Sequence, residues 1–335
     1  MATKSYKQIV KMMVFIVVLS TIITSCLKDA EKDSPISAIP IPEGVRVGNV
    51  EYKSDYSQQT YYNIFDNKIV ATSNIYSWDL GFESAEDGFH VILNSAKFMY
   101  AANSGKKDFN EVNSPSGLSF KFDEASGDLE KTAIGDWRQQ DVYVIDRGID
   151  PSPNFVRYKK LIVESLMRGA YAVRFADLNG ENEYRFQIPK DEDVSFVHFS
   201  FEDSGQVIPA PNKNTYQLFF TQYSASLENG DQYLDYLVRG ALINRDGISV
   251  AFTRDISFDA LTLEQAKNLK YSENIDGIGY DWKTFDLTSS NYTIHPDYIY
   301  VIRTKEGVYF KLHFTSYYNA QGQKGFPEFA FEILK

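Results

Sequence analysis

Residues 77–82, Ser77-Trp78-Asp79-Leu80-Gly81-Phe82, return in altered form as Thr215-Tyr216-Gln217-Leu218-Phe219-Phe220. Five further landmarks repeat in the same order: Ile92-Leu93-Asn94 as Leu242-Ile243-Asn244, Ile134-Gly135-Asp136-Trp137 as Ile278-Gly279-Tyr280-Asp281-Trp282, Val142-Tyr143-Val144-Ile145 as Ile299-Tyr300-Val301-Ile302, Tyr158-Lys159-Lys160-Leu161 as Tyr309-Phe310-Lys311-Leu312, and residues 183–190 as 328–335. The offset between partners varies only from about 138 to 157 residues, as loop insertions would make it. Six landmarks in one order predict a duplicated module.

Both copies have the sequence pattern of β structure. The chain has 23 Tyr and 24 Phe among its 335 residues, and its apolar residues alternate more often than they recur at helical spacing. Alternation of β-branched and aromatic residues is typical of strands, and it is clearest over residues 142–145, 171–175, 196–201, 298–302 and 308–314. Thr262, followed three residues later by Gln265, predicts one short helix. The predicted fold is all-β, with two tandem homologous β-sandwich-like modules and one or two short helices.

These patterns divide the chain into four segments. They are a signal peptide at 1–25, a tether at 26–46, a first β module at 47–192 and a second β module at 193–335. The boundary between the modules is placed in the charged stretch 189–195, which follows the last strand of the first copy. The sequence leaves open whether the two copies exchange a strand.

The N-terminus is typical of a bacterial lipoprotein. Lys4, Lys7 and Lys11 precede a largely apolar run at 12–23, which has the length of a signal-peptide core and is too short to span a bilayer. The run ends in Ile23-Thr24-Ser25-Cys26, which resembles a lipobox and predicts cleavage before Cys26 and lipidation of its sulfur. The alternative is an ordinary secretory signal with an incidental cysteine. Because the chain has one cysteine, lipidation leaves no thiol for a disulfide, a metal site or a nucleophile.

The charge balance indicates which partners to expect. Removing the signal takes away three of the 34 basic residues and no acidic ones, so the mature chain has 31 basic against 45 acidic residues and a net charge of −14. Such a chain repels nucleic acid, and nucleic acid is therefore not an expected partner. The stretch 27–33 is mostly charged and resembles the surface-export signals of Bacteroidetes lipoproteins. That resemblance implies a lipid-anchored location in the outer membrane, facing the cell exterior.

Three of the landmarks resemble the HmuY family. They are Trp78-Asp79-Leu80-Gly81-Phe82, Ile92-Leu93-Asn94-Ser95 and the segment at residues 300–312, and the resemblance extends over the signal, the lipobox and the two copies. This family comprises outer-surface lipoproteins of Bacteroidetes whose best-known short members are haem-binding, haemophore-like, all-β proteins. The resemblance implies capture of haem or a related porphyrin for uptake. It also implies transfer of this cargo to an outer-membrane partner, a TonB-dependent haem receptor.

Haem binding requires axial ligands and apolar or aromatic walls. His295 precedes the predicted strand at 298–302, where its imidazole would project from a rim, and it is the first candidate ligand. His90 alternates with Phe89 and Val91 on a predicted strand and is the second. Met99 is the third. For each of them the alternative is an ordinary packing or loop role, and these residues define no metal site apart from the haem iron.

The other histidines and the tryptophans have structural interpretations. His198 and His313 alternate within aromatic strands and are expected to be partly solvated. Trp137 and Trp282 recur at equivalent positions and are expected to be core anchors. Because no histidine has a histidine at its equivalent position in the other copy, two haem sites per chain are not expected.

The sequence contains no motif that supports an enzyme. Gly-x-Ser-x-Gly, phosphate-cradling glycine loops and His-Glu-x-x-His are all absent from it. Residues 177–183 place oxygen ligands around a glycine but lack a full calcium-loop pattern. The main alternative to haem capture is a surface interaction lipoprotein that binds protein or glycan through an aromatic β surface. An accessory subunit of a nutrient-uptake complex is a third hypothesis.

Overall fold

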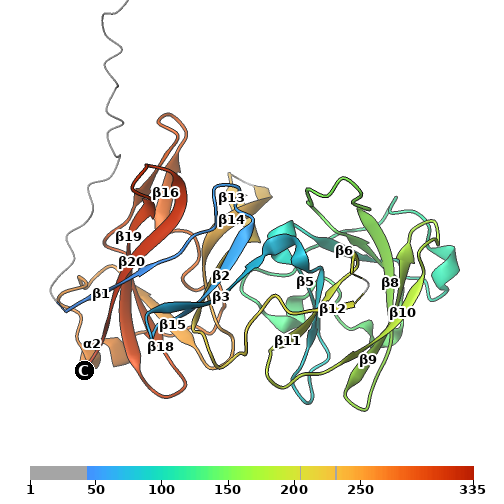
Figure 1. Cartoon of the computed structure of the whole chain (residues 1–335), viewed down its shortest axis with the longest axis horizontal. Coiled ribbons are helices and arrows are strands. Elements are labelled where there is room, and N and C mark those ends of the chain that lie inside the picture. The colour runs from blue at the N-terminus through green and yellow to red at the C-terminus, as the bar shows by residue number, and fades with distance from the viewer. Residues whose placement is uncertain (1–43, 204, 231) are drawn as a thin grey trace, which may run out of the picture. The chain divides into compact units, whose positions relative to one another are not determined.

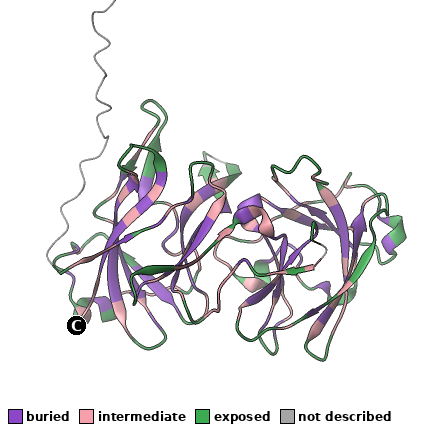
Figure 2. Cartoon of the chain, in the orientation of Figure 1, coloured by how far each residue is buried: buried purple, intermediate pink, exposed green. Residues whose placement is uncertain are grey.

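The structure is a computed structural model that describes residues 44–203, 205–230 and 232–335 (Figure 1). The predicted signal peptide, Cys26 and most of the predicted tether lie outside the described residues. The described chain consists mainly of antiparallel strands, so the all-β prediction is confirmed. Burial follows the strands, whereas turns and hairpin ends are exposed (Figure 2).

One group of strands comes from the middle of the chain, and we call it the middle group. It consists of a five-stranded sheet in the order β10-β9-β8-β7-β6 and a four-stranded sheet in the order β12-β11-β4-β5. The strands are β4 (Leu80–Glu83), β5 (Val91–Leu93), β6 (Tyr100–Asn103), β7 (Tyr143–Asp146), β8 (Tyr158–Met167), β9 (Ala170–Asp177), β10 (Tyr184–Pro189), β11 (Phe196–Ser200) and β12 (Gly205–Val207). Short 3-10 helices follow or join them: η1 (Ile75–Ser77), η2 (Ser95–Lys97), η3 (Phe109–Glu111), η4 (Leu129–Lys131) and η5 (Trp137–Gln139).

The second group combines both ends of the described chain, and we call it the terminal group. It has a five-stranded sheet in the order β1-β20-β19-β18-β15, a four-stranded sheet in the order β14-β13-β2-β3 and the hairpin β16-β17. The strands are β1 (Arg46–Asn49), β2 (Gln58–Asn63), β3 (Lys68–Asn74), β13 (Leu218–Asn229), β14 (Gln232–Ile243), β15 (Ser249–Thr253), β16 (Lys283–Asp286), β17 (Asn291–Ile294), β18 (Ile299–Arg303), β19 (Tyr309–Tyr318) and β20 (Lys324–Ile333). In Figure 1 the blue strands β1, β2 and β3 therefore lie among the orange and red ones.

The strand pairing crosses the predicted boundary at residue 192. Strand β1 pairs with β20, with Arg46 opposite Phe331, and β2 pairs with β13, with Tyr62 opposite Leu218. Strand β11, which follows the predicted boundary, pairs with β4 of the middle group. The division into modules at 47–192 and 193–335 stays a prediction, and strand pairing groups the chain differently.

The two groups have the same strand order. If β10, β11 and β12 are matched with β1, β2 and β3, every remaining strand of the middle group has a counterpart in the terminal group in chain order. This arrangement is the one expected when the first three strands of each copy are exchanged between two repeats. In this match β20 corresponds to β9, and β10 corresponds to β1, so the sequence landmark that paired residues 183–190 with 328–335 does not agree with the strand order. The duplication itself stays a prediction.

Local contacts at the repeated landmarks also match. The side-chain amide of Asn94 donates to the carbonyl oxygens of Ile75 and Trp78, and that of Asn244 donates to those of Lys213 and Tyr216. Each asparagine thus closes the turn that leads into its four-stranded sheet. The two copies of this landmark therefore form the same local structure.

The repeated lysines behave alike as well. Lys160 Nζ donates to the carbonyl oxygens of Phe109 and Val112 and lies 4.7 Å from the Phe109 ring centroid. Lys311 Nζ donates to the carbonyl oxygen of Phe258 and lies 4.6 Å from that ring. Both lysines are buried on a long strand, where backbone carbonyls and an aromatic face replace water around the ammonium group.

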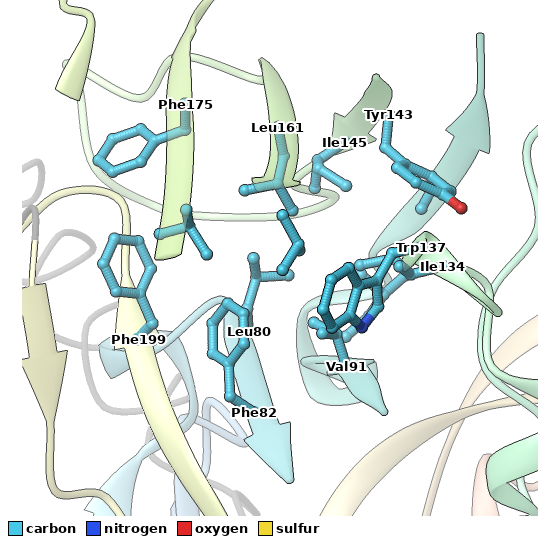
Figure 3. Close-up of a cluster of buried hydrophobic side chains, with 14 of the residues drawn as sticks. Leu80, Phe82, Val91, Ile134, Trp137, Tyr143, Ile145, Leu161, Phe175 and Phe199 are labelled. Atoms are coloured by element: carbon cyan, nitrogen blue, oxygen red, sulfur yellow. The ribbon is translucent and has the colours of Figure 1, made fainter. Parts of the chain in front are cut away.

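The two sheets of the middle group pack face to face over one core. Leu80 and Phe82 of β4 are fully buried and face Leu161 and Phe175 of β8 and β9 (Figure 3). Trp137 is 3% exposed, and its Nε1 donates to the Phe89 carbonyl oxygen at 2.6 Å. Alternating inward residues on two sheets are the usual basis of such a core.

The terminal group has an aromatic core. Phe329 of β20 packs against Tyr62 of β2 at 5.2 Å and against Phe220 of β13 at 5.4 Å between ring centroids. Trp282 is fully buried and stacks on Phe314 at 3.8 Å. The burial of Trp137 and Trp282 agrees with their expected role as core anchors.

The predicted helix is present. Helix α2 (Leu263–Lys267) begins after Thr262, whose hydroxyl accepts from the Gln265 N–H while the Gln265 side chain accepts from the Thr262 N–H. This reciprocal pairing satisfies two donors that a helix end otherwise leaves free. The helix packs its buried Ala266 against the outer face of β15 and β18.

A buried ion network joins the landmark Asp79 to the rest of the middle group. Its carboxylate accepts from Lys97 Nζ at 2.7 Å, from Arg147 Nε and Nη2 at 3.1 Å each and from the Phe201 N–H at 2.8 Å. Burial alone would raise the pKa of Asp79, but Lys97 and Arg147 together hold it below its ordinary value. The paired charges offset the cost of taking one another out of water.

The strand pairing predicts which fragment of the chain folds alone. A fragment of residues 78–209 contains all strands of the middle group and its core, so it should unfold cooperatively in urea when followed by tryptophan fluorescence. A fragment of residues 47–192 lacks β11 and β12, and it also lacks β20 and β13, the partners of β1 and β2, so it should not. If the fragment of residues 47–192 unfolded cooperatively and the fragment of residues 78–209 did not, the observed strand pairing would be contradicted.

Candidate functional site

A cavity with a volume of about 1070 Å³ is lined mainly by strands of the terminal group. Strands β13, β14 and β15 contribute lining residues to it, and so do β16, β17 and β18. The lining is completed by residues 274 and 276–281 and by residues 122 and 124–126, which follow β6. Ligand pockets in proteins commonly measure about 300–1,000 Å³, so this one has room for a large ligand.

Aromatic side chains dominate the walls of this cavity, which we call the large pocket. They come from several strands and loops: Phe122, Tyr223, Phe252, Tyr280, Phe285, Tyr292, Tyr298 and Tyr300. Tyr223 and Tyr300 are nearly fully buried, whereas Phe252 and Phe285 are 47% and 38% exposed. Burial raises the pKa values of Tyr223 and Tyr300 well above the ordinary tyrosine range, so both hydroxyls are neutral hydrogen-bonding groups.

Two cations line the same cavity and have few polar partners. Arg239 lies with its guanidinium carbon 4.1 Å from the Tyr56 ring centroid, and its buried Nε has no hydrogen-bond partner among the described residues. Lys283 is 7% exposed, and its Nζ donates to the carbonyl oxygens of Arg239 and Tyr280. The Lys283 ammonium also faces the rings of Trp282 at 4.1 Å and Tyr317 at 4.9 Å.

The ionisation of these groups is shifted by burial. Desolvation and the nearby Arg239 lower the pKa of Lys283 to about 7, although Asp281 acts in the opposite direction. Burial likewise raises the pKa of Asp276, with Glu124 and Asp281 adding to the effect. Arg254 is exposed at the edge of the pocket and pairs with Asp297 at 2.8 Å. The pocket lining therefore carries both signs of charge, with Glu124, Asp276 and Asp281 beside Arg239, Arg254 and Lys283.

The first predicted haem ligand, His295, lies beside the large pocket. Its ring stacks on Tyr298 at 4.8 Å between centroids, and its Nε2 lies 2.7 Å from Thr284 Oγ1. Both neighbours line the pocket, while His295 contacts that wall from the other side. His295 is therefore next to lining residues of the pocket, and its role as a ligand stays a prediction.

The structure does not bring the other two predicted ligands to the large pocket. His90 is in the middle group, where Nδ1 lies 2.6 Å from Glu83 Oε2 and the ring stacks on Phe89. Met99 is fully buried in the core of the middle group. Their roles as ligands stay predictions.

The structure corrects the expectation for His313. The side chain is 5% exposed because Phe258, from the segment before α2, covers the outer face of β19 and packs on the imidazole at 4.5 Å. Burial lowers the pKa of His313 below its ordinary value. His198 is half-buried, and its ring meets Trp78 edge-on at 4.5 Å.

The sequence did not single out Arg239 or Lys283. The sequence feature that could have identified them is a basic residue inside an aromatic stretch, as in Asp281-Trp282-Lys283. Such a residue is more often exposed than buried. Within residues 44–203, 205–230 and 232–335, no three His, Cys, Asp or Glu side chains gather closely enough to hold a metal ion. In the same ranges, no helix combines the length and the apolar character needed to cross a bilayer.

The lowered pKa of Lys283 predicts a specific pH dependence of stability. Between pH 7 and the ordinary lysine value of 10.5, the unfolded chain binds the proton that the folded chain has released, so this residue makes the free energy of unfolding rise with pH. We expect Lys283→Met to reduce the rise between about pH 7.5 and about pH 9.5 by about 2 kcal/mol in urea unfolding. Lys305→Met, at an exposed lysine, is the control. If the free energy of unfolding of Lys283→Met rose with pH as much as that of the unmodified chain, the lowered pKa of Lys283 would be contradicted.

Comparison with known proteins places the chain in a family. The family model described as HmuY protein matches residues 55–331, which is well over half of the chain. A search of the curated proteins found no match.

Among solved structures, apo PinO from Porphyromonas gingivitis is 8% identical, with 88% of this chain and 99% of that chain covered and a TM-score of 0.25. The apo HmuY analog TFO from Tannerella forsythia is 10% identical, with 89% and 99% covered and a TM-score of 0.26. The assignment rests on the family match: the chain belongs to the HmuY family.

Proposed function

We propose that this protein is a surface-anchored ligand-binding lipoprotein that captures haem or a related porphyrin in the large pocket for uptake. The observation that carries the proposal is an aromatic cavity of about 1070 Å³ with His295 against its wall. Membership of the HmuY family is consistent with it. The role is binding, and no catalytic step is proposed.

The walls of the pocket suit a flat, conjugated ligand. Phe252 and Phe285 are partly exposed, so they would gain burial when a macrocycle enters. Tyr298 and Tyr300 lie on the same side of the pocket as Phe252, whose ring centroid is 5.0 Å from that of Tyr298 and 5.5 Å from that of Tyr300. Such side chains bind a porphyrin through stacking and edge contacts.

The cations of the pocket suit the two carboxylates of haem. Arg239 has an unpaired buried Nε, and Lys283 has only carbonyl oxygens as hydrogen-bond acceptors among the described residues. A propionate that approached them would form charge-assisted hydrogen bonds in a place that excludes much of the water. It would also favour the charged form of Lys283.

His295 is the proposed axial ligand. When Nε2–H donates to Thr284 Oγ1, the ring presents the lone pair of Nδ1, and this second contact fixes the imidazole as is usual for metal-binding histidines. The ring reaches the pocket wall from behind Thr284 and Tyr298, so binding would require the imidazole to turn past one of them.

The proposal includes the setting of the protein. We propose lipidation at Cys26, an outer-membrane location facing the cell exterior, and delivery of the cargo to a TonB-dependent haem receptor. These three features rest on the lipobox resemblance at residues 23–26 and on the family, since the segment lies outside the described residues.

One observation favours the alternative function, which is binding of a non-haem partner such as a protein or a glycan. The lining of the large pocket contains tyrosines and charged residues but no His, Met or Cys among the described residues. Exposed Tyr233, Tyr236 and Leu287 on the two neighbouring hairpins add aromatic and apolar surface. Planar aromatic faces and hydroxyls also suit sugar rings and peptide side chains.

A haemin titration of the mature chain lacking Cys26 distinguishes the two functions. We expect a saturable, shifted Soret band, and we expect His295→Ala to weaken haemin binding by about tenfold or more because it removes a bond to iron. His90→Ala should change the affinity little, since His90 is paired with Glu83 in the other strand group. A spectrum equal to that of free haemin would contradict haem capture. If His90→Ala lost haemin binding while His295→Ala kept it, the assignment of His295 as the axial ligand would be contradicted.

A further inference from the structure

A second, smaller cavity lies where the four-stranded sheets of the two strand groups approach each other. It has a volume of about 140 Å³ and shares no lining residue with the large pocket. Strands β2 and β11, the segments leading into β4 and β13, and the segment after β14 all contribute to it. We call it the sheet crevice. An engineered cavity of about 150 Å³ is known to hold one benzene molecule, so this volume suits one six-membered ring.

Aromatic rings form two sides of the sheet crevice. Tyr61 stacks on Phe219 at 4.6 Å with an interplanar angle of 14° and meets Tyr216 edge-on at 4.9 Å. Across from them, Trp78 meets His198 edge-on at 4.5 Å. Trp78 and Tyr216 occupy matching positions in the repeated landmark, so the crevice lies between two copies of one local structure.

One buried donor in the crevice lacks a partner. Trp78 is 8% exposed, and its Nε1 has no hydrogen-bond acceptor among the described residues. An indole N–H is a donor only, and leaving it unpaired in a buried place costs about 1–3 kcal/mol. A ligand oxygen that accepted this hydrogen bond would remove the cost. The unpaired donor thus indicates an acceptor-bearing ligand.

Arg245 supplies positive charge that its surroundings do not neutralise directly. Its guanidinium carbon lies 5.0 Å from the Phe196 ring centroid, and Nη2 donates to the Gly127 carbonyl oxygen at 3.3 Å. Among the described residues it forms no ion pair within 4.0 Å. Burial lowers the pKa of Arg245, which is the direction expected for a cation short of partners.

The carboxylates that act on Arg245 are those of Asp246, Glu83 and Asp123, and each also has another partner. Glu83 Oε2 lies 2.6 Å from His90 Nδ1. The carboxylate of Asp246 accepts from the Ser195 hydroxyl, and that of Asp123 accepts from the Leu93 and Ala133 N–H groups at 2.7 Å each. Among the described residues, no Asp or Glu lines the sheet crevice, whereas Lys213 and Arg245 both do. Burial lowers the pKa of His198 to about 4. Its imidazole is therefore neutral at pH 7 and adds no positive charge to that of Lys213 and Arg245.

We propose that the sheet crevice is a second ligand site that binds a small aromatic carboxylate. The ring lies between Tyr61 and Trp78, and the carboxylate accepts from Trp78 Nε1 and from Arg245. The carboxylate would thus supply a partner to both the indole donor and the guanidinium. The size of the crevice limits the ligand to one ring. The site is independent of haem capture because it uses different residues.

Benzoate and benzamide, a charged and a neutral probe of one shape, test this site in the mature chain lacking Cys26. Isothermal titration at pH 7 should show saturable benzoate binding, about tenfold or more tighter than benzamide binding, because only benzoate neutralises Arg245. Arg245→Gln should remove this preference. Trp78→Phe, which keeps a ring but removes the donor, should weaken benzoate binding several-fold.

Controls separate these effects from loss of fold. Arg185→Gln removes an exposed arginine of β10 and should leave benzoate binding unchanged. Thermal unfolding of each variant checks that it is folded, and neutral benzamide should still bind to folded Arg245→Gln. Absence of saturable benzoate binding to the unmodified chain would overturn the proposal. Binding that is unchanged in both folded Arg245→Gln and folded Trp78→Phe would overturn it too. Neither outcome depends on whether haemin binds.

Discussion

The structure depends on the pairing of the first described strands with the last. Strand β1 lies beside β20 and β2 beside β13, so Arg46 is opposite Phe331 and Tyr62 is opposite Leu218. Without β1 to β3, strand β13 would lose its neighbour β2, and Phe329 would lose its contact with Tyr62. Pairing over so many residues costs loop-closure entropy, which the aromatic core of the terminal group must offset.

The same pairing forms the large pocket. Tyr52, in the segment between β1 and β2, is 1% exposed and donates its hydroxyl to the Gly240 carbonyl oxygen at 2.8 Å. Tyr56 supports the guanidinium of Arg239 from the side at 4.1 Å. The N-terminal segment therefore fixes β14 and the cation that faces a ligand. In a chain with a net charge of −11, the charged residues that line the sheet crevice are Lys213 and Arg245, so the crevice favours anions that the rest of the surface repels.

Local features of the fold could be predicted from the sequence, and long-range ones could not. Alternation gave the strands, the Thr262 and Gln265 pattern gave α2, and the repeated landmarks include Asn94 and Asn244, which form the same turn. The pairing of β1 with β20 and of β2 with β13 was not predictable, because alternation specifies a face of a strand and not its neighbour. The solvated position expected for His313 failed for a related reason, since Phe258 covers the second face of the sheet. The sequence could not indicate Lys283, Arg239 or Arg245, because these residues acquire their significance only from tertiary burial.

The central claim is that the large pocket holds the ligand, and a crystal structure of the mature chain soaked with haemin tests it most directly. The account predicts a macrocycle between Phe252, Tyr298 and Phe285, with a propionate near Arg239 or Lys283 and iron on the imidazole of His295. A macrocycle bound elsewhere, or a large pocket left empty at saturating haemin while another site is filled, would contradict the account.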